Sequence, residues 1–357
     1  MKILIDVGHP AHVHFFRNAI NEWEDRGHEV IITARDKDVA LSLLKACGFN
    51  YIYLGKSEKG TLNKGLNMLK LDYNLLKLTK KLKPDVMLGI HDPYIAQVGR
   101  LARRPSIIFT DTELVRYTWL VFPFSSTICT PASFKLNLGS KHVKYNGYHE
   151  LAYLHPNYFE PNPRILEEAN LSRDDEYIIV RFISWSAYHD SDLRGLSSEI
   201  GLIKALEKYG QVFVSSERRL NKELEKYRLP VPPEKIHHLL YYAQLYIGEG
   251  GTMAAEAAIL GTPAIHIEST SNGLASGNFT GNFLELRDKY GLLYFYPNQD
   301  QALKKAEELL EEGKAVKKMW KIKRKKLVED KIDVTEWMVN FVENYPESFY
   351  EYRYHKT

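Results

Sequence analysis

The sequence has few cysteines, little net charge and no long apolar run, and each shortage excludes a class of protein. Two cysteines in 357 residues, Cys47 and Cys129, exclude a disulfide framework and a cysteine-based zinc site. A formal net charge of +3 is too small to indicate a nucleic-acid partner. No apolar run approaches the ~18 residues of a membrane span, and the apolar run at the N-terminus is too short for a secretory signal. These shortages predict a cytoplasmic protein.

Several familiar cofactor and metal motifs are missing as well. The sequence contains no phosphate-binding P-loop and no G-x-G-x-x-G fingerprint after its first apolar run. His9, His12 and His14 could bind a metal together with Asp92 or Asp111, but no H-E-x-x-H pair or similar spacing accompanies them. We therefore expect neither a metal nor a cofactor.

Short apolar runs alternate with amphipathic helical segments along the chain. The run at 3–5 precedes a helical pattern over 12–26, and similar pairs follow it. This alternation indicates βαβ units and parallel sheets. A proline-rich segment at 155–163 separates two such sets. We predict an α/β protein with two Rossmann-like, doubly wound parallel-sheet domains that face a cleft. The expected bounds are 1–158 and 159–335, with a C-terminal helix and tail, 336–357, crossing back to the first domain.

The stretch 245–267, LYIGEGGTMAAEAAILGTPAIHI, carries the strongest local signal. It predicts a strand, a glycine turn at 248–251, a helix from Thr252 to Leu260, and a second strand. Free N–H groups at the start of such a helix suit a phosphate. Glu256 follows about a turn and a half later, where a carboxylate could hold ribose hydroxyls. A tight turn with a solvated glutamate is the alternative.

Histidines, acids and serines gather at the predicted strand ends. Ligands of open parallel sheets lie beyond the carboxyl ends of the strands, so this concentration favours a polar site there. Each group also has a structural interpretation: Asp92 before Pro93 suits a helix N-cap, and His12 could cap the first helix. The groups are His9, His12 and His14; His91 and Asp92; Asp111 and Glu113; Ser184, Ser186, His189 and Asp190; and His266 and Glu268.

Two further stretches are unusual in composition. We expect the aromatic segment 116–124, RYTWLVFPF, to be core, with the wall of an acceptor site or a membrane contact as alternatives. The basic segment 314–326, KAVKKMWKIKRKK, predicts a helix with a solvated charged face over a packed stripe. It could instead rest on an anionic membrane surface, which would place the protein at the inner face of the cell membrane.

The stretch 245–267 resembles the nucleotide-sugar motif of glycosyltransferase-B enzymes, above all the N-acetylglucosaminyltransferase of peptidoglycan synthesis. That family has a glycine turn, a ribose-binding glutamate six residues later, and a glycine before x-Pro five residues further on. The matching positions are Gly250, Glu256, Gly261 and Pro263. His12 also keeps the family's spacing of fifteen residues to the glycine that ends the first helix, although Pro10 and Ala11 replace two loop glycines.

The chain is also similar to the UDP-N-acetylglucosamine 2-epimerases, which share this fold. Their His-Gly-Asp-Thr and His-Val-Glu turns are matched only loosely, by 91–92 and 111–113. Their His-Arg-Arg-Glu-Asn loop is absent, and FISWSAYHD stands at 182–190. The segments at 109–113 and 145–159, FTDTE and YNGYHELAYLHPNYF, resemble an archaeal and bacterial family of unknown function with the same fold.

The resemblance implies a glycosyltransferase that moves a sugar from a nucleotide diphosphate sugar, with UDP as the expected nucleotide, to a glycan or lipid-linked acceptor. The nucleobase of the donor would lie near residues 236–239. We expect a short strand at 235–237 in this segment. The implied donor-site residues are Ser184, Ser186, Gly250, Gly251, Thr252, Glu256 and Asn282. The alternatives are a UDP-N-acetylglucosamine 2-epimerase and a non-catalytic nucleotide-sugar-binding protein.

One of His12, Asp92, Asp111 and Glu113 would be the general base on the acceptor side. His12 is the first choice, because a helix N-terminus disfavours the protonated imidazole and a base must be neutral near pH 7. Asp92 and Asp111 would orient it, as carboxylates do for catalytic histidines.

Overall fold

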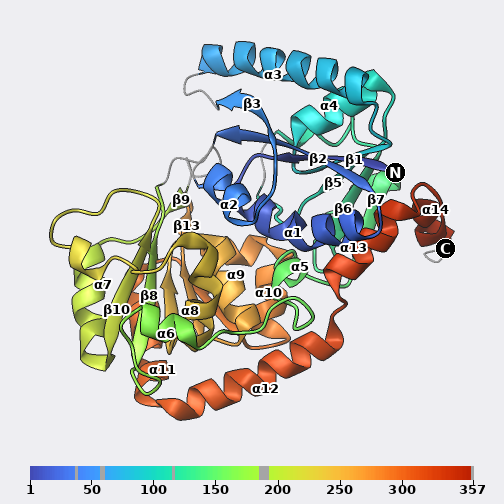
Figure 1. Ribbon diagram of the computed structural model, residues 1–357. Helices are drawn as coiled ribbons and strands as arrows, with labels where there is room; N and C mark the ends of the chain where they lie inside the picture. Colours follow the sequence, from blue (N-terminus) through green and yellow to red (C-terminus); the bar gives the residue numbers. More distant parts are fainter. Residues whose placement is uncertain (37–38, 57–60, 115–116, 185–192, 355–357) are drawn as a thin grey trace. The chain divides into compact units, whose positions relative to one another are not determined.

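The computed structural model describes the chain apart from residues 37–38, 57–60, 115–116, 185–192 and 355–357 (Figure 1). The chain divides into two compact units, and each contains one parallel sheet. The first unit combines Met1–Tyr158 with Ile332–Thr357, and the second is Phe159–Lys331. No helix among the described residues is long and apolar enough to cross a bilayer.

A seven-stranded parallel sheet forms the centre of the first unit, in the order β3-β2-β1-β4-β5-β6-β7. Its strands are β1 (Lys2–Val7), β2 (Glu29–Asp36), β3 (Ile52–Lys56), β4 (Val86–Ile90), β5 (Ser106–Phe109), β6 (Thr127–Pro131) and β7 (His142–Tyr145). The sequence pattern predicts the first five. It misses β6 and β7, which mix apolar with polar residues and are mostly buried in the sheet.

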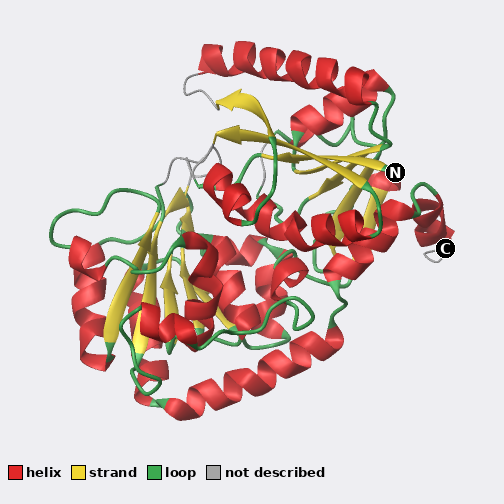
Figure 2. Ribbon diagram, in the orientation of Figure 1, coloured by secondary structure: helices red, strands yellow, loops and turns green. Residues whose placement is uncertain are grey.

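Helices cover both faces of this sheet (Figures 1 and 2). They are α1 (Pro10–Asp25), α2 (Ala40–Ala46), α3 (Thr61–Leu82), α4 (Pro93–Ala102), α5 (Leu151–Leu154), α13 (Val334–Glu343) and α14 (Glu347–Tyr354). Helices α3 and α4 pack together on one face, while α1 packs against α2, α5 and α13 on the other. The buried stripe of α1, which includes Phe15, Phe16 and Trp23, is the one that its periodicity predicts.

The second unit has a five-stranded parallel sheet in the order β10-β8-β11-β12-β14. Its strands are β8 (Tyr177–Phe182), β10 (Gln211–Ser216), β11 (Leu245–Gly248), β12 (Ala264–Ile267) and β14 (Leu293–Tyr296). A short antiparallel pair, β9 (Leu193–Arg194) and β13 (Ser269–Thr270), lies outside that sheet. The helices are α6 (Arg164–Glu168), α7 (Glu199–Leu206), α8 (Ile236–Tyr242), α9 (Gly251–Leu260), α10 (Gly281–Asp288), α11 (Gln299–Glu311) and α12 (Lys314–Asp330). Each unit is therefore a doubly wound α/β domain, as the sequence predicts.

Two local predictions in this unit are wrong. Residues 235–237 form no strand, because the chain enters α8 there directly after a 3-10 turn. The apolar residues of α8 recur at helical spacing, and a three-residue window cannot distinguish that period from a strand. The sequence pattern over 219–227 also predicts a helix, whereas the structure has turns and a 3-10 segment there, Glu225–Tyr227.

The aromatic segment 117–124 is core only in part: Val121 belongs to the core of the first unit and Phe122 packs against it. Val121 is buried, but Trp119 is 65% exposed, and Tyr117 and Phe124 are exposed as well. Trp119 lies in a 3-10 turn, Thr118–Leu120, that Tyr117 precedes, and the Gln97 side chain holds this turn to α4 by a hydrogen bond to the Leu120 carbonyl (3.0 Å). Hydrophobicity alone could not reveal this, because a single turn presents only part of its residues to the core.

The basic helix α12 uses part of its charge inside the second unit. Three of its cations donate hydrogen bonds to carbonyls at or just beyond the ends of other helices: Lys317 to Ala243 (2.8 Å), Lys323 to Gly291 (2.7 Å) and Arg324 to Ile259 (3.1 Å). Cations at helix C-termini complement the helix dipole. Burial nevertheless lowers the pKa of Lys317 to about 7. The membrane interpretation of this helix therefore concerns only its exposed side, where Ile322 lies.

Candidate functional site

The glycine turn between β11 and α9 lies at the carboxyl edge of the second sheet. Gly248 has φ +157°, and a Cβ there would come within 2.5 Å of the Arg181 carbonyl oxygen on β8. Gly250 is the N-cap of α9 with φ +84°, a backbone conformation that residues with a side chain rarely adopt. A Cβ added at this position would lie 2.9 Å from the Ile183 side chain. The turn therefore needs glycine both for its φ angles and for the close approach of two strand ends.

The start of α9 presents the features of an anion site. The first N–H groups of a helix have no acceptor within the helix, and the dipole favours a negative charge beside them. Thr252 is exposed in this first turn, and Gly251 packs on Phe283 of α10. Gly250, Gly251 and Thr252 thus surround the point where the sequence places a phosphate.

Glu256 is buried, which argues against the alternative that this motif is a tight turn with a solvated glutamate. Its side chain points at α8, where Oε1 lies 3.0 Å from His237 Nε2, and both residues are almost fully buried. A buried carboxylate requires such a partner. The resemblance placed the nucleobase near 236–239 but did not select His237. We expected a strand at 235–237, so the position of His237 on a helix was not predicted.

Glu249, in the middle of the glycine turn, is a residue that sequence reasoning missed. It is 2% exposed, and its carboxylate accepts hydrogen bonds from the Ile183 amide (3.0 Å) and the Leu196 amide (2.8 Å). Glu249 therefore joins the end of β8 and the segment before α7 to the turn that begins α9. Two backbone donors offset its charge, so an anion beside the turn faces less repulsion.

The other predicted donor-site residues lie near this edge or outside the described part of the chain. Ser184 follows β8, and Glu217 accepts hydrogen bonds from its amide (3.2 Å) and hydroxyl (3.3 Å). Asn282 is buried in the first turn of α10, where its side-chain oxygen accepts from the Phe283 amide (2.9 Å). Ser186, together with His189 and Asp190, lies outside the described residues.

His266, on β12 beside Gly248, is buried with both ring nitrogens lacking a hydrogen-bond partner among the described residues. Its ring packs edge-on against Phe283 at 5.1 Å, and Nε2 is 4.0 Å from Glu268 Oε2. Burial lowers the pKa of His266 to about 3. Burial therefore favours the neutral imidazole near pH 7.

The low pKa of His266 predicts a specific loss of stability in acid. Unfolded histidine binds a proton below about pH 6.5, whereas the folded protein resists protonation down to about pH 3, so stability falls as the pH drops through this window. His266→Phe should remove this contribution. Between pH 7 and pH 4.5, wild type should lose about 2.5 kcal/mol more unfolding free energy than the variant. Urea unfolding at both pH values measures the difference, and equal losses would contradict the assignment.

On the first unit, Asp92 has a structural role. Its Oδ1 caps α4 by accepting from the Ile95 amide (3.0 Å), and its Oδ2 accepts from Arg35 Nη2 (2.6 Å), which also binds Asp6 (2.7 Å). Burial raises the pKa of Asp92 well above its usual range, although the Arg35 charge opposes this. Asp92 therefore holds β1, β2 and α4 together, and this role competes with that of a general base.

His12 is oriented differently from the expectation. Its Nδ1 accepts a hydrogen bond from the Gly8 amide (3.3 Å), and the neighbouring His9 caps α1 by accepting from the Ala11 amide (3.2 Å). With Nδ1 as acceptor, the neutral His12 ring carries its proton on Nε2. In this tautomer Nε2 donates a hydrogen bond rather than accepting a proton. Asp92, expected to orient His12, binds Arg35 instead.

Asp111, at the end of β5, pairs with a histidine that sequence reasoning did not select. Asp111 Oδ2 lies 3.5 Å from His149 Nδ1, and the buried His149 ring packs against Phe15 (4.4 Å) and stacks with Tyr145 (6.3 Å). Burial lowers the pKa of His149, although the Asp111 charge opposes this. The Asp111 side chain is 28% exposed, so it can reach a ligand while His149 holds it.

Glu113 lies two residues further along and contacts a different element. Its Oε1 accepts a hydrogen bond from the Lys135 amide (2.7 Å), which lies in the loop between β6 and β7. Glu113 therefore joins the end of β5 to that loop. Among the four predicted acceptor-side residues, Asp111 is the one with both a partly exposed carboxylate and a buried partner, His149, that holds it.

Comparisons with known proteins agree with this architecture. The chain is similar to a structure assigned as a UDP-N-acetylglucosamine 2-epimerase from Listeria monocytogenes (TM-score 0.62, 13% identity, 90% of each chain covered). It is similar to the spinosyn rhamnosyltransferase SpnG (TM-score 0.62, 13% identity, 96% of this chain and 100% of that one). It is also similar to MurG from Acinetobacter baumannii (TM-score 0.56, 15% identity, 96% and 99%). These likenesses confirm the glycosyltransferase-B fold.

Sequence comparison identifies the family directly. The chain is 26% identical over 279 residues to the uncharacterized protein MJ0665 of Methanocaldococcus jannaschii, covering 74% of this chain and 81% of the relative. A family model described as "Protein of unknown function (DUF354)" matches residues 1–279. The chain therefore belongs to the DUF354 family, and its structure has the glycosyltransferase-B fold.

Proposed function

We propose that this protein is a glycosyltransferase that moves a sugar from a nucleotide diphosphate sugar, with UDP as the nucleotide, to an acceptor hydroxyl without a metal. One observation carries the proposal: the glycine turn opens a helix whose sixth residue, Glu256, is buried and held by His237. A helix N-terminus can bind a diphosphate, and a fixed carboxylate can accept hydrogen bonds from ribose hydroxyls. The names of the similar structures add support for a nucleotide-sugar substrate.

Within this proposal, the donor binds to the second unit. Gly250, Gly251 and Thr252 hold the diphosphate with their backbone N–H groups, and Ser184 supports it. Glu256 binds the ribose. Asn282 and the loop before it face the sugar, with the undescribed Ser186 assigned to the same site. The helix dipole stabilises the charge that develops on the leaving diphosphate, so no metal is needed for that task.

We assign the general base to Asp111 rather than to His12. As the acceptor oxygen bonds to the anomeric carbon, its proton passes to the Asp111 carboxylate. The bond between that carbon and the diphosphate oxygen breaks, and the nucleoside diphosphate leaves with the electron pair. His149 positions the carboxylate, and we assign the Nε2–H of the neutral His12 ring as a hydrogen-bond donor to the acceptor.

The donor assignment predicts the effect of Glu256→Ala. Loss of charge-assisted hydrogen bonds to the ribose should weaken UDP binding by about 1.5–3 kcal/mol, which is roughly 10- to 150-fold. Isothermal calorimetry with UDP measures the change, and urea unfolding checks that the fold survives. Glu167→Ala, an exposed glutamate of the same unit, is the control and should bind as wild type does. Unchanged affinity in Glu256→Ala would remove the ribose assignment.

Two alternatives remain open to a direct test. An epimerase would convert UDP-N-acetylglucosamine without any acceptor, so the appearance of its 2-epimer in that incubation would replace the transferase proposal. A non-catalytic binding protein would bind UDP-sugars and turn over none of them across a panel of glycan and lipid-linked acceptors.

The exposed aromatic rings near Trp119 support peripheral membrane contact as part of the transferase proposal, since a lipid-linked acceptor requires such contact.

A further inference from the structure

Helix α12 has one packed face and one open face. Val316, Trp320 and Leu327 are buried and form its packed stripe. In Figure 1 the rest of the second unit lies along one side of the helix. The open face contains Met319, which is 47% exposed, and Ile322, which is 72% exposed. A helix with two such faces buries its apolar stripe in the protein and leaves the other face for water or for a partner.

Apolar residues lie along the centre of the open face. Residues 315, 319, 322 and 326 are all exposed and recur at spacings of four, three and four, so they follow one line along the helix. The first three are Ala315, Met319 and Ile322, and the last is Lys326. Apolar side chains scattered singly on a surface are ordinary, but Met319 and Ile322 are neighbours on the same face.

A row of lysines runs beside this apolar line. Its members are all exposed and recur at the same spacing, which places them on the adjacent side of the helix. The segment 314–326 contains no carboxylate that could offset their charge. The open face is therefore an apolar strip with positive charge along one side. The lysines of this row are Lys314, Lys318, Lys321 and Lys325.

The fold of the second unit makes little use of this row. The three cations of α12 that bond to helix-end carbonyls belong to other sides of the helix. Lys325 pairs with Glu329 at 3.7 Å, on the surface. Like charges one turn apart repel each other, so the row carries a local cost. Within the part of the chain that the structure describes, no ion pair with a carboxylate is formed by Lys314, Lys318 or Lys321.

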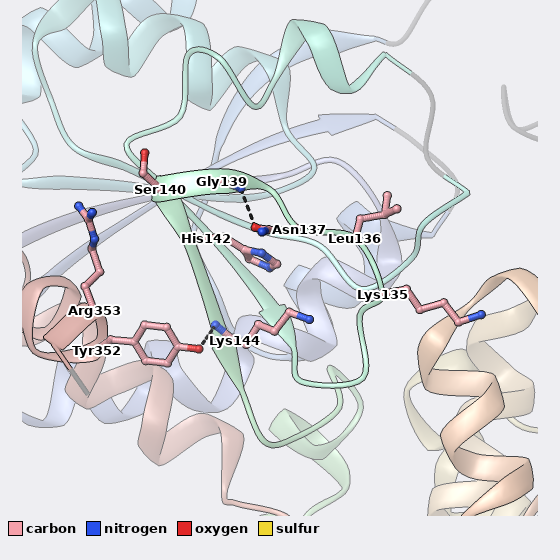
Figure 3. A pocket seen from close by; sticks show the side chains of 9 residues that line it. All are labelled: Lys135, Leu136, Asn137, Gly139, Ser140, His142, Lys144, Tyr352 and Arg353. Carbon is pink, nitrogen blue, oxygen red and sulfur yellow. Dashed lines mark hydrogen bonds between the residues drawn. The ribbon is translucent and has the colours of Figure 1, made fainter. Parts of the chain in front are cut away.

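Cations also line a pocket on the first unit, but their charged ends do not converge. This pocket, of about 430 Å³, lies among the β6–β7 loop, β7 and α14 (Figure 3). Lys135 and Arg353 stand at its opposite ends, and the Lys144 side chain donates to the Phe134 carbonyl. The lysines of α12 share one open face instead, which suits an extended anionic partner.

We propose that the open face of α12 binds the surface of an anionic lipid bilayer. Such a surface presents many negative charges in one plane, and a row of lysines can meet several of them at once. The apolar line favours a bilayer over a nucleic acid. Met319 and Ile322 can enter the apolar layer beneath the headgroups, whereas a nucleic acid offers this face a charged backbone. The helix lies parallel to the bilayer, and the contact depends neither on a nucleotide nor on the proposed sugar transfer.

The test is sedimentation of the full chain with vesicles, in the absence of any nucleotide. The protein should bind vesicles of equal parts phosphatidylcholine and phosphatidylglycerol but not vesicles of phosphatidylcholine alone, and raised salt should weaken the binding. The triple substitution Lys314→Gln/Lys318→Gln/Lys321→Gln should weaken binding by roughly 100-fold, because each lysine near an anionic surface contributes about fivefold.

A matched control removes the same charge from elsewhere in the second unit. Lys204→Gln/Lys222→Gln/Lys226→Gln changes three exposed lysines outside α12 and should bind vesicles nearly as wild type does. Urea unfolding checks that both triple variants keep the fold.

Two further variants separate the apolar contribution and the first unit. Met319→Ser/Ile322→Ser keeps every charge and should weaken vesicle binding by roughly tenfold or more, because two apolar side chains no longer leave water. Trp119→Ser removes the ring assigned to membrane contact on the first unit. Binding that survives Trp119→Ser and is lost in the lysine triple would assign this contact to α12.

Several results would overturn the proposal. These are absence of binding to anionic vesicles, unchanged binding in the lysine triple, and an equal loss in the control triple. Loss in Trp119→Ser with none in the α12 variants would place the contact on the first unit. Binding to duplex DNA that needs the three lysines, together with unchanged vesicle binding in Met319→Ser/Ile322→Ser, would identify a nucleic-acid partner instead. UDP binding, measured separately, reports on the donor site, so either proposal can fail alone.

Discussion

Replacing Gly250 with valine should reduce UDP binding by at least 100-fold, the largest effect that we expect on the donor site. Gly250 has φ +84°, which costs an L-residue about 1–2 kcal/mol and a β-branched one more. Its Cβ would lie 2.9 Å from Ile183 at the end of β8. In the proposed donor site, the side chain would also occupy the space where the backbone N–H groups approach the diphosphate.

Because Gly250→Val could destabilise the whole unit, a gentler pair of variants isolates the effect on binding. Gly250→Ala and Gly261→Ala change glycines at the two ends of the same helix, with φ +84° and +79° and Cβ contacts of 2.9 and 3.0 Å. Both should lose unfolding free energy in urea, and Gly250→Ala should lose more, because ψ is 112° at Gly250 and 28° at Gly261, and only the latter lies in the left-handed region that alanine can enter. Only Gly250→Ala should lose UDP affinity by calorimetry. If both bind UDP as wild type does, the phosphate site lies elsewhere.

Asp111→Asn should lower turnover by about 100-fold or more, the usual range for loss of a general base, while UDP affinity stays near that of wild type. The amide keeps the size of the carboxylate but cannot take a proton. The kinetics require one active donor and acceptor pair, and kcat and the UDP dissociation constant are measured on the same preparation. His149→Gln should lower turnover less and shift the pH dependence of kcat, because it alters the support of Asp111 rather than the base itself.

The three rival residues provide the comparison. His12→Ala should lower turnover through loss of a donor, and Glu113→Gln should have a modest effect through the β6–β7 loop. Asp92→Asn should reduce stability more than turnover, because Asp92 caps α4 and binds Arg35. Full activity of Asp111→Asn together with a strong loss in His12→Ala would return the base to the histidine. Full activity of all four variants would move the acceptor site elsewhere.

Local sequence was sufficient for the elements of the glycine-turn motif at 245–267. The glycine turn, the helix 251–260 and the strand after it follow from positive φ angles and from residue propensities, which depend on neighbours in the chain. The N-cap role of Asp92 was visible for the same reason, because the cap and its Ile95 amide are three residues apart. The sequence failed where no local pattern marks a strand: β6 and β7 are short and mix apolar with polar residues, and their burial comes from their place in the sheet.

By itself, the sequence determined the alternation of strands and helices, the glycine turn and the residue types at the strand ends. Only the tertiary structure decided which of these residues touch. Glu256 meets His237 across two helices, Glu249 binds amides 66 and 53 residues away, and Asp111 meets His149 rather than His12. Strand order and helix packing set such pairings, and a hydrogen bond depends on distance and direction in space. Residue spacing along the chain cannot supply either quantity once the partners lie on different elements.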